Sequence, residues 1–324
     1  MLLPILIILS AATIPTLIYV LIFYWADRYE REPTWLLIVA FGWGAGPAIL
    51  ASLAGELLLQ GPLLAAPDVA NLGLLGNALA APVIEEVVKW LALLALFYFK
   101  RQEFDGPLDG LIYGALVGFG FAMTENIFYF IGAYGEGGYA GLTGLIFVRS
   151  LLFGMNHAFY TALSGIGLGL ARDANRRSTG ILWAAAGLLA AISAHALHNL
   201  AATLSQINLA ALLISLMLAA ANLGLIIIVV MLSWRQEQAA IRTQLADEVG
   251  STLSAAEYTA LPRSWRNPLH PSRAGNQSAQ RAQLCVELAL CKDRLQKRGP
   301  AREPGLPAQI AALREALQDE GMAG

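Results

Sequence analysis

The chain has 324 residues, of which 57% are hydrophobic and 14% are charged, and its formal net charge at pH 7 is −2. A mean hydropathy of +0.57 lies far from the balance of a soluble globular domain and indicates an integral membrane protein. The small net charge gives no sign of a nucleic-acid partner, and we expect none.

About seven apolar runs are long enough to cross a hydrocarbon core, which takes about 20 helical residues. Backbone groups in lipid must form their hydrogen bonds within the segment, so runs of this kind are helical. The sequence therefore predicts an all-α, polytopic transmembrane helical bundle of about seven spans. The predicted spans are Leu2–Tyr24, Trp35–Leu59, Leu72–Tyr98, Leu108–Tyr134, Leu142–Leu170, Ile181–Leu204 and Leu209–Trp234.

Basic residues in the connecting loops orient these spans. They follow the first, third and fifth spans, as Arg28, Arg31, Lys100, Arg101, Arg172, Arg176 and Arg177. The other loops contain no Lys or Arg, namely Gln60–Asn71, Gly135–Gly141 and Ser205–Asn208. The positive-inside rule then predicts an extracytoplasmic N-terminus and a cytoplasmic C-terminal tail.

The chain becomes polar after residue 234, so we expect a transmembrane domain over 1–234 and a partly helical tail over 235–324. Helix-like stretches occupy Arg235–Ala260, Arg281–Lys297 and Leu306–Gln318, and Pro262–Gln280 has the composition of a linker. Ile310, Leu313 and Leu317 recur at helical spacing, which suits packing on a partner or on the membrane domain. The alternative is a solvated, partly mobile tail.

Polar side chains inside the spans mark candidate sites, because ionisable groups in lipid are costly unless they are paired or hydrated. They are Glu85, Glu86, Lys89, Glu125, Asn126, Arg149, Asn156, His157, His195, His198 and Asn199. Four of them, on separate spans, lie roughly 20–25 Å from the cytoplasmic end of their helix. These are Glu85, Glu125, His157 and His195. A shared depth predicts one shared cavity.

Each of these residues also has a purely structural interpretation. A Glu–Lys pair one turn apart, such as Glu85 with Lys89, is the spacing of a neutralised ion pair. Membrane His and Asn side chains often only join helices by hydrogen bonds. Arg149 is close enough to the outer surface to extend toward water or to pair with Glu56. These interpretations leave the convergence of three carboxylates and two histidines unexplained.

Carboxylates and imidazoles in a buried pocket suit three kinds of chemistry. A glutamate can activate water while His or Asn donates to the developing oxyanion. The same groups can hold a divalent metal such as zinc with an open position for water. They can also relay protons or ions, as in transporters. The residue types alone do not separate these uses.

Several motifs, in this order along the chain, resemble the PrsW family of intramembrane proteases, which are related to the CAAX prenyl endopeptidases and to bacterial CPBP/Abi membrane proteins. The motifs are Asp27–Pro33, Pro82–Trp90 with its Glu-Glu-x-x-Lys, Asp109–Gly114, Gly118–Asn126, Arg149 with His157, and His195-x-x-x-Asn199. The resemblance covers about Tyr24–Leu200 and does not extend to the tail.

The resemblance implies an intramembrane endopeptidase of the bacterial cytoplasmic (inner) membrane, with a single-span membrane protein such as an anti-sigma factor as substrate. The catalytic residues that it implies are Glu85, Glu86, Glu125, His157, His195 and Asn199. Supporting roles fall to Lys89, Asn126, Arg149 and His198, although His198 matches no position of the motifs. We expect Glu85 to be the base, assisted by Glu125 or Glu86, and Asn199 to donate to the oxyanion.

The use of a metal stays open. The family is often called metalloprotease, and His157, His195 and Glu125 are the candidate ligands of a zinc ion. Without a metal, the histidines would polarise the carbonyl, and the CAAX relatives, which have a histidine where Glu125 stands, are compatible with a glutamate mechanism. Two other functions remain, a proton-coupled transporter and a non-enzymatic scaffold. No inverted repeat is visible, which weighs against the transporter.

Overall fold

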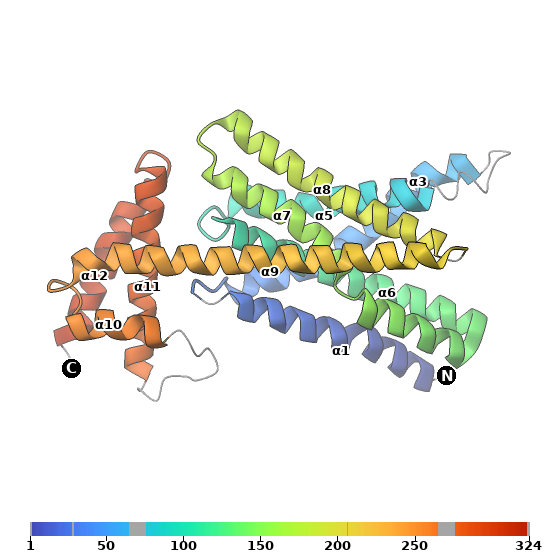
Figure 1. Ribbon diagram of the computed structural model, residues 1–324, viewed down its shortest axis with the longest axis horizontal. Helices are drawn as coiled ribbons and strands as arrows, with labels where there is room; N and C mark the ends of the chain where they lie inside the picture. Colours follow the sequence, from blue (N-terminus) through green and yellow to red (C-terminus); the bar gives the residue numbers. More distant parts are fainter. Residues whose placement is uncertain (1, 28, 65–75, 206, 265–275, 323–324) are drawn as a thin grey trace. The chain divides into compact units, whose positions relative to one another are not determined.

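The computed structural model describes residues 2–27, 29–64, 76–205, 207–264 and 276–322. These residues are mainly helical and contain no β-strand, which confirms the predicted all-α class (Figure 1). They form two compact units. The first comprises Met1–Ala26 and Glu32–Val229, and the second comprises Asp27–Arg31 and Val230–Gly324.

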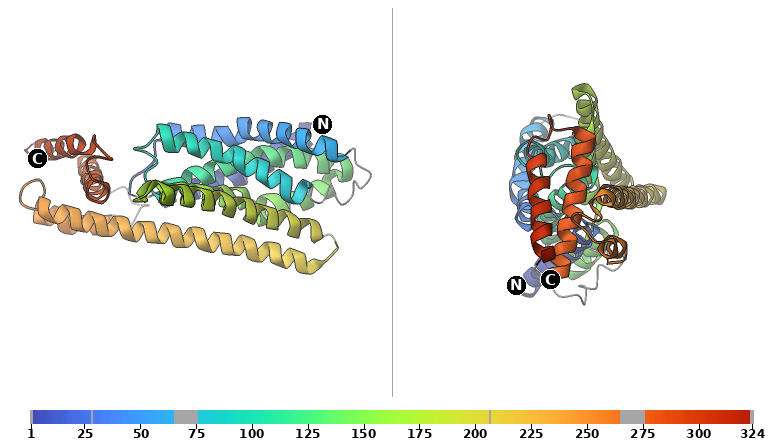
Figure 2. Two further views of the ribbon diagram at one scale, coloured as in Figure 1. Left: turned by 90° about the horizontal axis from the view of Figure 1, so that it is seen from above. Right: turned by 90° about the vertical axis from the view of Figure 1, so that its left-hand side faces the viewer.

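The long helices of the first unit lie side by side along one direction (Figures 1 and 2). In chain order they are α1 (Leu2–Ala26), α2 (Thr34–Trp43), the π-helix η1 (Gly44–Ala48), α3 (Ile49–Leu64), the π-helix η2 (Gly76–Ala80), α5 (Ala81–Phe99), α6 (Pro107–Ile146), the π-helix η3 (Phe147–Leu152), α7 (Asn156–Asp173), α8 (Arg177–Leu204) and α9 (Leu209–Leu245). By length and composition, 5 segments of the described chain can span a membrane.

Two features relate these 5 segments to the predicted number of about seven spans. Helix α5 is not among the 5, since its 19 residues include Glu85, Glu86 and Lys89. The segment Pro107–Asp173, with 67 residues, is counted once. It is about three times longer than the ~20 residues that one span needs. The count of seven stays a prediction.

The segment Pro107–Asp173 folds back at Gly138. The φ of this glycine is 58° and its ψ is −144°, a backbone conformation that only glycine adopts readily. Tyr134 and Tyr139, on either side of it, lie with ring centroids 5.3 Å apart. The loop predicted over Gly135–Gly141 is wrong in extent, because α6 is helical on both sides of this single residue.

Other predicted boundaries also need correction. The fifth span, Leu142–Leu170, is interrupted by a turn at 153–155 between η3 and α7. The seventh continues beyond Trp234 to Leu245 as one helix, because the polar residues that follow are mostly good helix formers. Three predicted features lie outside the described residues: the basic residue Arg28, the end of the loop Gln60–Asn71 and the start of the third span at Leu72.

The second unit has a hydrophobic core of its own. It contains the end of α9, the 3₁₀ turn η4 (Ala246–Glu248), α10 (Ala255–Ser264), α11 (Asn276–Arg298) and α12 (Leu306–Met322). Ile310, Leu313 and Leu317 are buried in this core, together with Tyr29 from the segment between α1 and α2. These three residues therefore pack inside the second unit itself, so the described part of the polar region has a folded core.

The predicted boundaries within this polar region also change. The stretch Arg235–Ala260 is not one helix, because η4 and a turn separate α9 from α10. The predicted linker Pro262–Gln280 is helical at both ends, in α10 up to Ser264 and in α11 from Asn276. Its middle, 265–275, lies outside the described residues.

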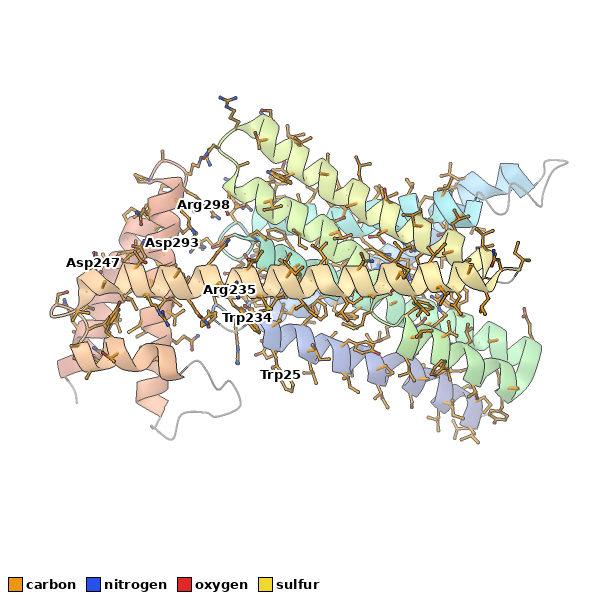
Figure 3. The ribbon with its side chains drawn as sticks, in the orientation of Figure 1. Trp25, Trp234, Arg235, Asp247, Asp293 and Arg298 are labelled. Carbon is orange, nitrogen blue, oxygen red and sulfur yellow. The ribbon has the colours of Figure 1, made fainter. Side chains whose placement is uncertain are left out.

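A buried carboxylate ties the second unit together. Glu248 accepts hydrogen bonds from Lys292 at 2.7 Å, Arg314 at 2.5 Å and Thr252 at 2.8 Å. Burial alone would raise the pKa of Glu248, but these donors outweigh burial and lower it to about 2. Among the residues that Figure 3 labels are Asp247 beyond α9 and Asp293 and Arg298 on α11, which also belong to this unit. Each of them forms an ion pair within the unit.

Candidate active site

Three charged side chains of α5 form the base of the site. Glu85, Glu86 and Lys89 share one face of the helix, because they lie three and four residues apart. The Lys89 ammonium donates to Glu85 Oε2 at 3.1 Å and to Glu86 Oε1 at 2.9 Å. Its third contact is His157 Nδ1 on α7 at 3.2 Å, and the Phe121 ring lies 3.7 Å from it. Lys89 is fully buried, as a paired charge inside a membrane bundle should be.

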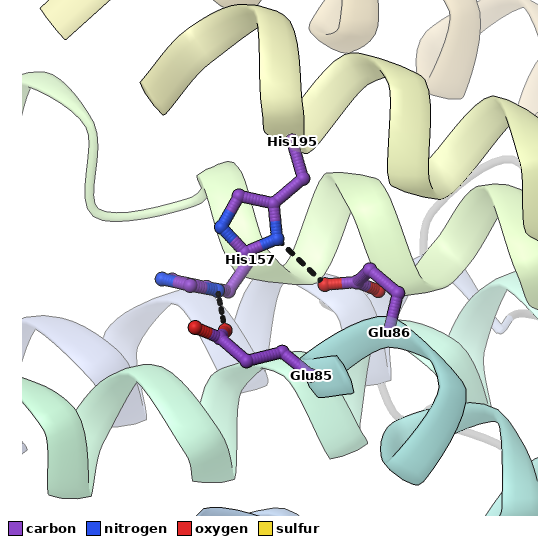
Figure 4. A group of neighbouring side chains, drawn as sticks. All are labelled: Glu85, Glu86, His157 and His195. Atoms are coloured by element: carbon purple, nitrogen blue, oxygen red, sulfur yellow. Dashed lines mark hydrogen bonds and ion pairs between the residues drawn. The ribbon is translucent and has the colours of Figure 1, made fainter. Parts of the chain in front are cut away.

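The two histidines come from helices that face α5. Figure 4 shows His157 of α7 beside Glu85 and His195 of α8 beside Glu86. His195 Nδ1 lies 3.1 Å from Glu86 Oε1, and Thr161 donates to the other oxygen of Glu86 at 3.0 Å. One ligand atom from each of Glu85, Glu86, His157 and His195 lies within 4.8 Å of the others. The structure thus brings together four residues that were singled out from the sequence.

Glu125 of α6 lies on the side of the His157 ring that faces away from Lys89. Its Oε2 is 2.9 Å from His157 Nε2 and also accepts a short hydrogen bond from the Arg149 guanidinium. Arg149 donates to Asn126 Oδ1 at 2.7 Å as well, so one guanidinium holds neighbouring residues of α6. Arg149 thus pairs with Glu125, and among the described residues it forms no ion pair with Glu56.

The π-helix η3 places Arg149 for this role. Insertions of this kind shift the register of a helix and are frequent at functional sites. The guanidinium also lies over the Tyr129 ring, 3.9 Å from its centroid, so it is held on a third side. Arg149 thus joins η3 to two neighbouring residues of α6, Glu125 and Asn126.

The contacts assign the proton of His157. A lysine ammonium can only donate, so Nδ1 of His157 accepts from Lys89. Nε2 therefore carries the proton of the neutral ring and donates it to Glu125. By the same reasoning, His195 donates from Nδ1 to Glu86, which leaves its lone pair on Nε2. Each imidazole is held in one orientation by a carboxylate, as is usual for histidines of catalytic and metal sites.

The remaining candidates of α8 differ in their surroundings. His198 does not touch the cluster of carboxylates; its Nδ1 lies 2.6 Å from Ser215 Oγ of α9 and 3.2 Å from Asn156 Nδ2. Asn199 is half-buried one turn after His195. Ser215 could not be recognised from the sequence, because a serine in an apolar helix is common and carries no spacing signal.

Glycines of α6 set the distance between α6 and α7. A Cβ atom at Gly118 would lie 2.4 Å from the backbone oxygen of His157, and one at Gly114 would lie 2.5 Å from that of Thr161. The two backbones therefore touch at the level of the site. This close approach brings the ring of His157 on α7 to Glu125 on α6.

The comparison with family models now becomes informative. The model described as "PrsW family intramembrane metalloprotease" matches residues 32–239, which include every residue of the cluster. The chain belongs to the PrsW family. It is therefore a peptidase and a multi-pass membrane protein, which decides against the transporter and the scaffold.

Curated relatives agree with this assignment. Protease PrsW of Geobacillus kaustophilus is 30% identical over 177 residues, which cover 55% of this chain and 72% of the relative. Protease PrsW of Bacillus subtilis is 32% identical over 165 residues, 51% of this chain and 69% of the relative. No solved structure matches this chain. PrsW-family membership implies a membrane-embedded protein substrate.

The four residues of the cluster are of the types that bind a divalent metal. Two imidazoles and two carboxylates that are mostly buried and close together are ordinary ligands of catalytic zinc. The group differs from the predicted ligands His157, His195 and Glu125. Glu125 stands outside it and is paired with Arg149, whereas Glu85 and Glu86 belong to it. The sequence could not make this distinction, because all three glutamates lie at similar depth.

The glycine contact predicts a selective loss of activity. Gly118→Ala should push α7 away from α6 and move His157 from Glu125, with a fall of about 10²-fold in turnover, the effect of a misplacement of about 1 Å. Cleavage of a single-span reporter in proteoliposomes measures it. Gly132→Ala, at a glycine of the same helix with open space around it, should stay near wild type. Equal activity of both variants would contradict the proposed role of this contact.

Proposed function

We propose that this protein is an intramembrane endopeptidase that hydrolyses a peptide bond of a single-span membrane protein, with Glu85 as the base that activates water. One observation carries the proposal. The carboxylates of α5 and the imidazoles of α7 and α8 meet in one buried cluster inside a bundle with apolar outer faces. A peptide bond reaches such a cluster only from within the membrane domain.

The two neighbouring glutamates differ in their hydrogen bonds. Glu86 is fully buried, and both of its oxygens accept hydrogen bonds, from Lys89 and His195 on one side and from Thr161 on the other. Among the described residues, the contacts of Glu85 fall on a single oxygen, Oε2. A base needs room for water and a free lone pair. This difference favours Glu85 as the base and gives Glu86 a positioning role.

The other residues would then act on the scissile carbonyl. His157 retains some accessibility and is oriented by Glu125, which Arg149 holds in turn. His195 has its lone pair on Nε2, and Asn199 is one turn further along α8. An oxyanion that develops during water attack is stabilised by hydrogen-bond donors. Because His157 and His195 each donate their only ring proton to a carboxylate, we expect the side-chain amide of Asn199 to be the donor nearest to the substrate oxygen.

A bound zinc ion would be held by Glu85, Glu86, His157 and His195, where it would polarise the carbonyl and make water more acidic. These four residues orient the reacting groups whether or not a metal takes part. The family description as metalloprotease supports the metal. Within the family, an anti-sigma factor is the substrate that we propose, and its single span would bring the cleaved bond to the level of the cluster.

The glutamates can be separated by experiment. Glu85→Gln keeps the shape of the side chain but removes the base, so turnover should fall by about 10²–10⁴ while the fold stays intact. Glu86→Gln should instead lower the free energy of unfolding by about 1–3 kcal/mol, because one of the two acceptor oxygens is replaced by an amide donor that faces buried donors. Cleavage in proteoliposomes and unfolding in detergent measure the two effects. A fully active Glu85→Gln variant would place the base at Glu86 or Glu125.

We further propose about seven spans, an extracytoplasmic N-terminus and a cytoplasmic second unit. The fold-back at Gly138 supports this arrangement, because it divides Pro107–Asp173 into segments that run in opposite directions. The charged helix α5 supplies a further span whose charges are neutralised inside the bundle. The distribution of Lys and Arg between the loops gives the orientation.

Cysteine labelling tests this topology. Single cysteines at Gly137 and Ser205 should react with a membrane-impermeant reagent outside intact cells, and one at Ala174 should not. Gly137 has open space around it, so a side chain there is tolerated. The protein without an added cysteine is the control, since its own Cys285 and Cys291 are buried. Reaction of the Ala174 variant from outside would reverse the orientation.

A further inference from the structure

We infer that the ammonium group of Lys89 and a divalent metal compete for one position in the cluster, so that Lys89 sets the metal affinity of the site. The inference rests on the proposed function only in treating Glu85, Glu86, His157 and His195 as the metal ligands. It assigns a regulatory role to Lys89, which lies at the spacing of a structural ion pair with Glu85 and Glu86.

Three of the four residues that could bind a metal also bind the ammonium of Lys89. An ammonium has three N–H donors, and Lys89 has one acceptor for each of them. The acceptors are Glu85 Oε2, Glu86 Oε1 and His157 Nδ1, at 3.1, 2.9 and 3.2 Å. All three residues belong to the group that could hold a metal ion. The nitrogen of Lys89 thus occupies the position from which these ligands can be reached together.

The size of the cluster agrees with an ammonium at its centre. Tetrahedral ligands at about 2.0–2.2 Å from zinc are roughly 3.4 Å apart. Around an ammonium, with hydrogen bonds of about 3 Å, the same geometry separates the acceptors by roughly 4.9 Å. The ligand atoms of the cluster are spread over up to 4.8 Å. Metal binding would therefore require the cluster to contract after the ammonium leaves.

His157 gives a second, chemical reason for competition. A histidine binds a metal through a nitrogen lone pair, and the Nδ1 lone pair of His157 accepts a hydrogen bond from Lys89. The other ring nitrogen is not an alternative, because it carries the proton donated to Glu125. Arg149 holds Glu125 in place, so a flip of the His157 ring would break its hydrogen bond to Glu125. Zinc and Lys89 therefore need the same lone pair.

Charge balance disfavours a site that holds both cations. With Lys89 alone, one positive charge faces the two carboxylates of α5. A divalent metal alone would neutralise both of them. The two cations together would leave a net positive charge in a buried site, and an uncompensated buried charge costs about 3–5 kcal/mol. Binding of the metal would therefore require the ammonium to move away on its flexible four-carbon stem.

Removal of the ammonium should therefore create a tighter metal site. We expect purified full-length Lys89→Met to bind one zinc ion at least about tenfold more tightly than wild type, a difference of about 1.4 kcal/mol. Equilibrium dialysis against buffered zinc, followed by elemental analysis, measures the affinity without any cleavage assay. Lys100→Met, which removes a lysine after the last turn of the same helix, should bind zinc as wild type does.

Further variants identify the site and cover loss of the fold. His195→Ala in the Lys89→Met background should abolish the tighter binding. If Lys89→Met does not fold, Lys89→Gln keeps an N–H donor for the carboxylates without the charge and should show the same gain. Zinc should also raise the unfolding temperature of the substituted protein more than that of wild type, because only the folded cluster binds it.

The outcomes separate this inference from the proposed function. Equal zinc affinities of wild type and both Lys89 variants would overturn the inference, and so would absence of binding in all of them. If chelated wild-type protein still cleaves single-span proteins, the proposed endopeptidase function stands whether or not the inference is correct. A gain in affinity without any cleavage of single-span proteins by wild type would support the competition and count against the proposed function.

Discussion

Charged side chains on a membrane helix have to be neutralised inside the protein, and the structure of the first unit depends on how α5 achieves this. Glu85, Glu86 and Lys89 would cost several kcal/mol each in lipid without partners. Lys89 satisfies both carboxylates and still has a donor for α7, while Glu86 has an acceptor position left for α8. The ion pairs that neutralise α5 are therefore the contacts that join the helices of the active site.

The packing of the helices therefore also determines the geometry of the site. Gly118 lets α6 approach α7 until their backbones touch, and this approach puts His157 between Lys89 on one side and Glu125 on the other. Arg149 completes the chain of contacts from η3. A network with every member hydrogen-bonded specifies one arrangement of its helices, which is what a preorganised site requires. The same network explains why a metal and a lysine would compete.

Much of this could be predicted from the sequence. The apolar runs gave the class, and the common depth of Glu85, His157 and His195 anticipated a shared cluster. The sequence could not predict that Glu85 and Glu86 join the histidine cluster while Glu125 pairs with Arg149. Arg149 lies in a π-helix, and helical periodicity does not predict the direction of its side chain. The fold of the second unit was missed for a related reason. Its core combines helices far apart in the chain with Tyr29, and helical periodicity describes only one element at a time.

The coupling between α5 and α8 tests the central claim most directly. Glu86→Gln, His195→Ala and the double variant form a cycle whose free energies of unfolding can be measured in mixtures of mild detergent and dodecyl sulfate. If these residues share a buried network, their effects should fail to add by at least about 1 kcal/mol. Additive effects within a few tenths of a kcal/mol would show that the two helices are not joined through this pair and would contradict the account.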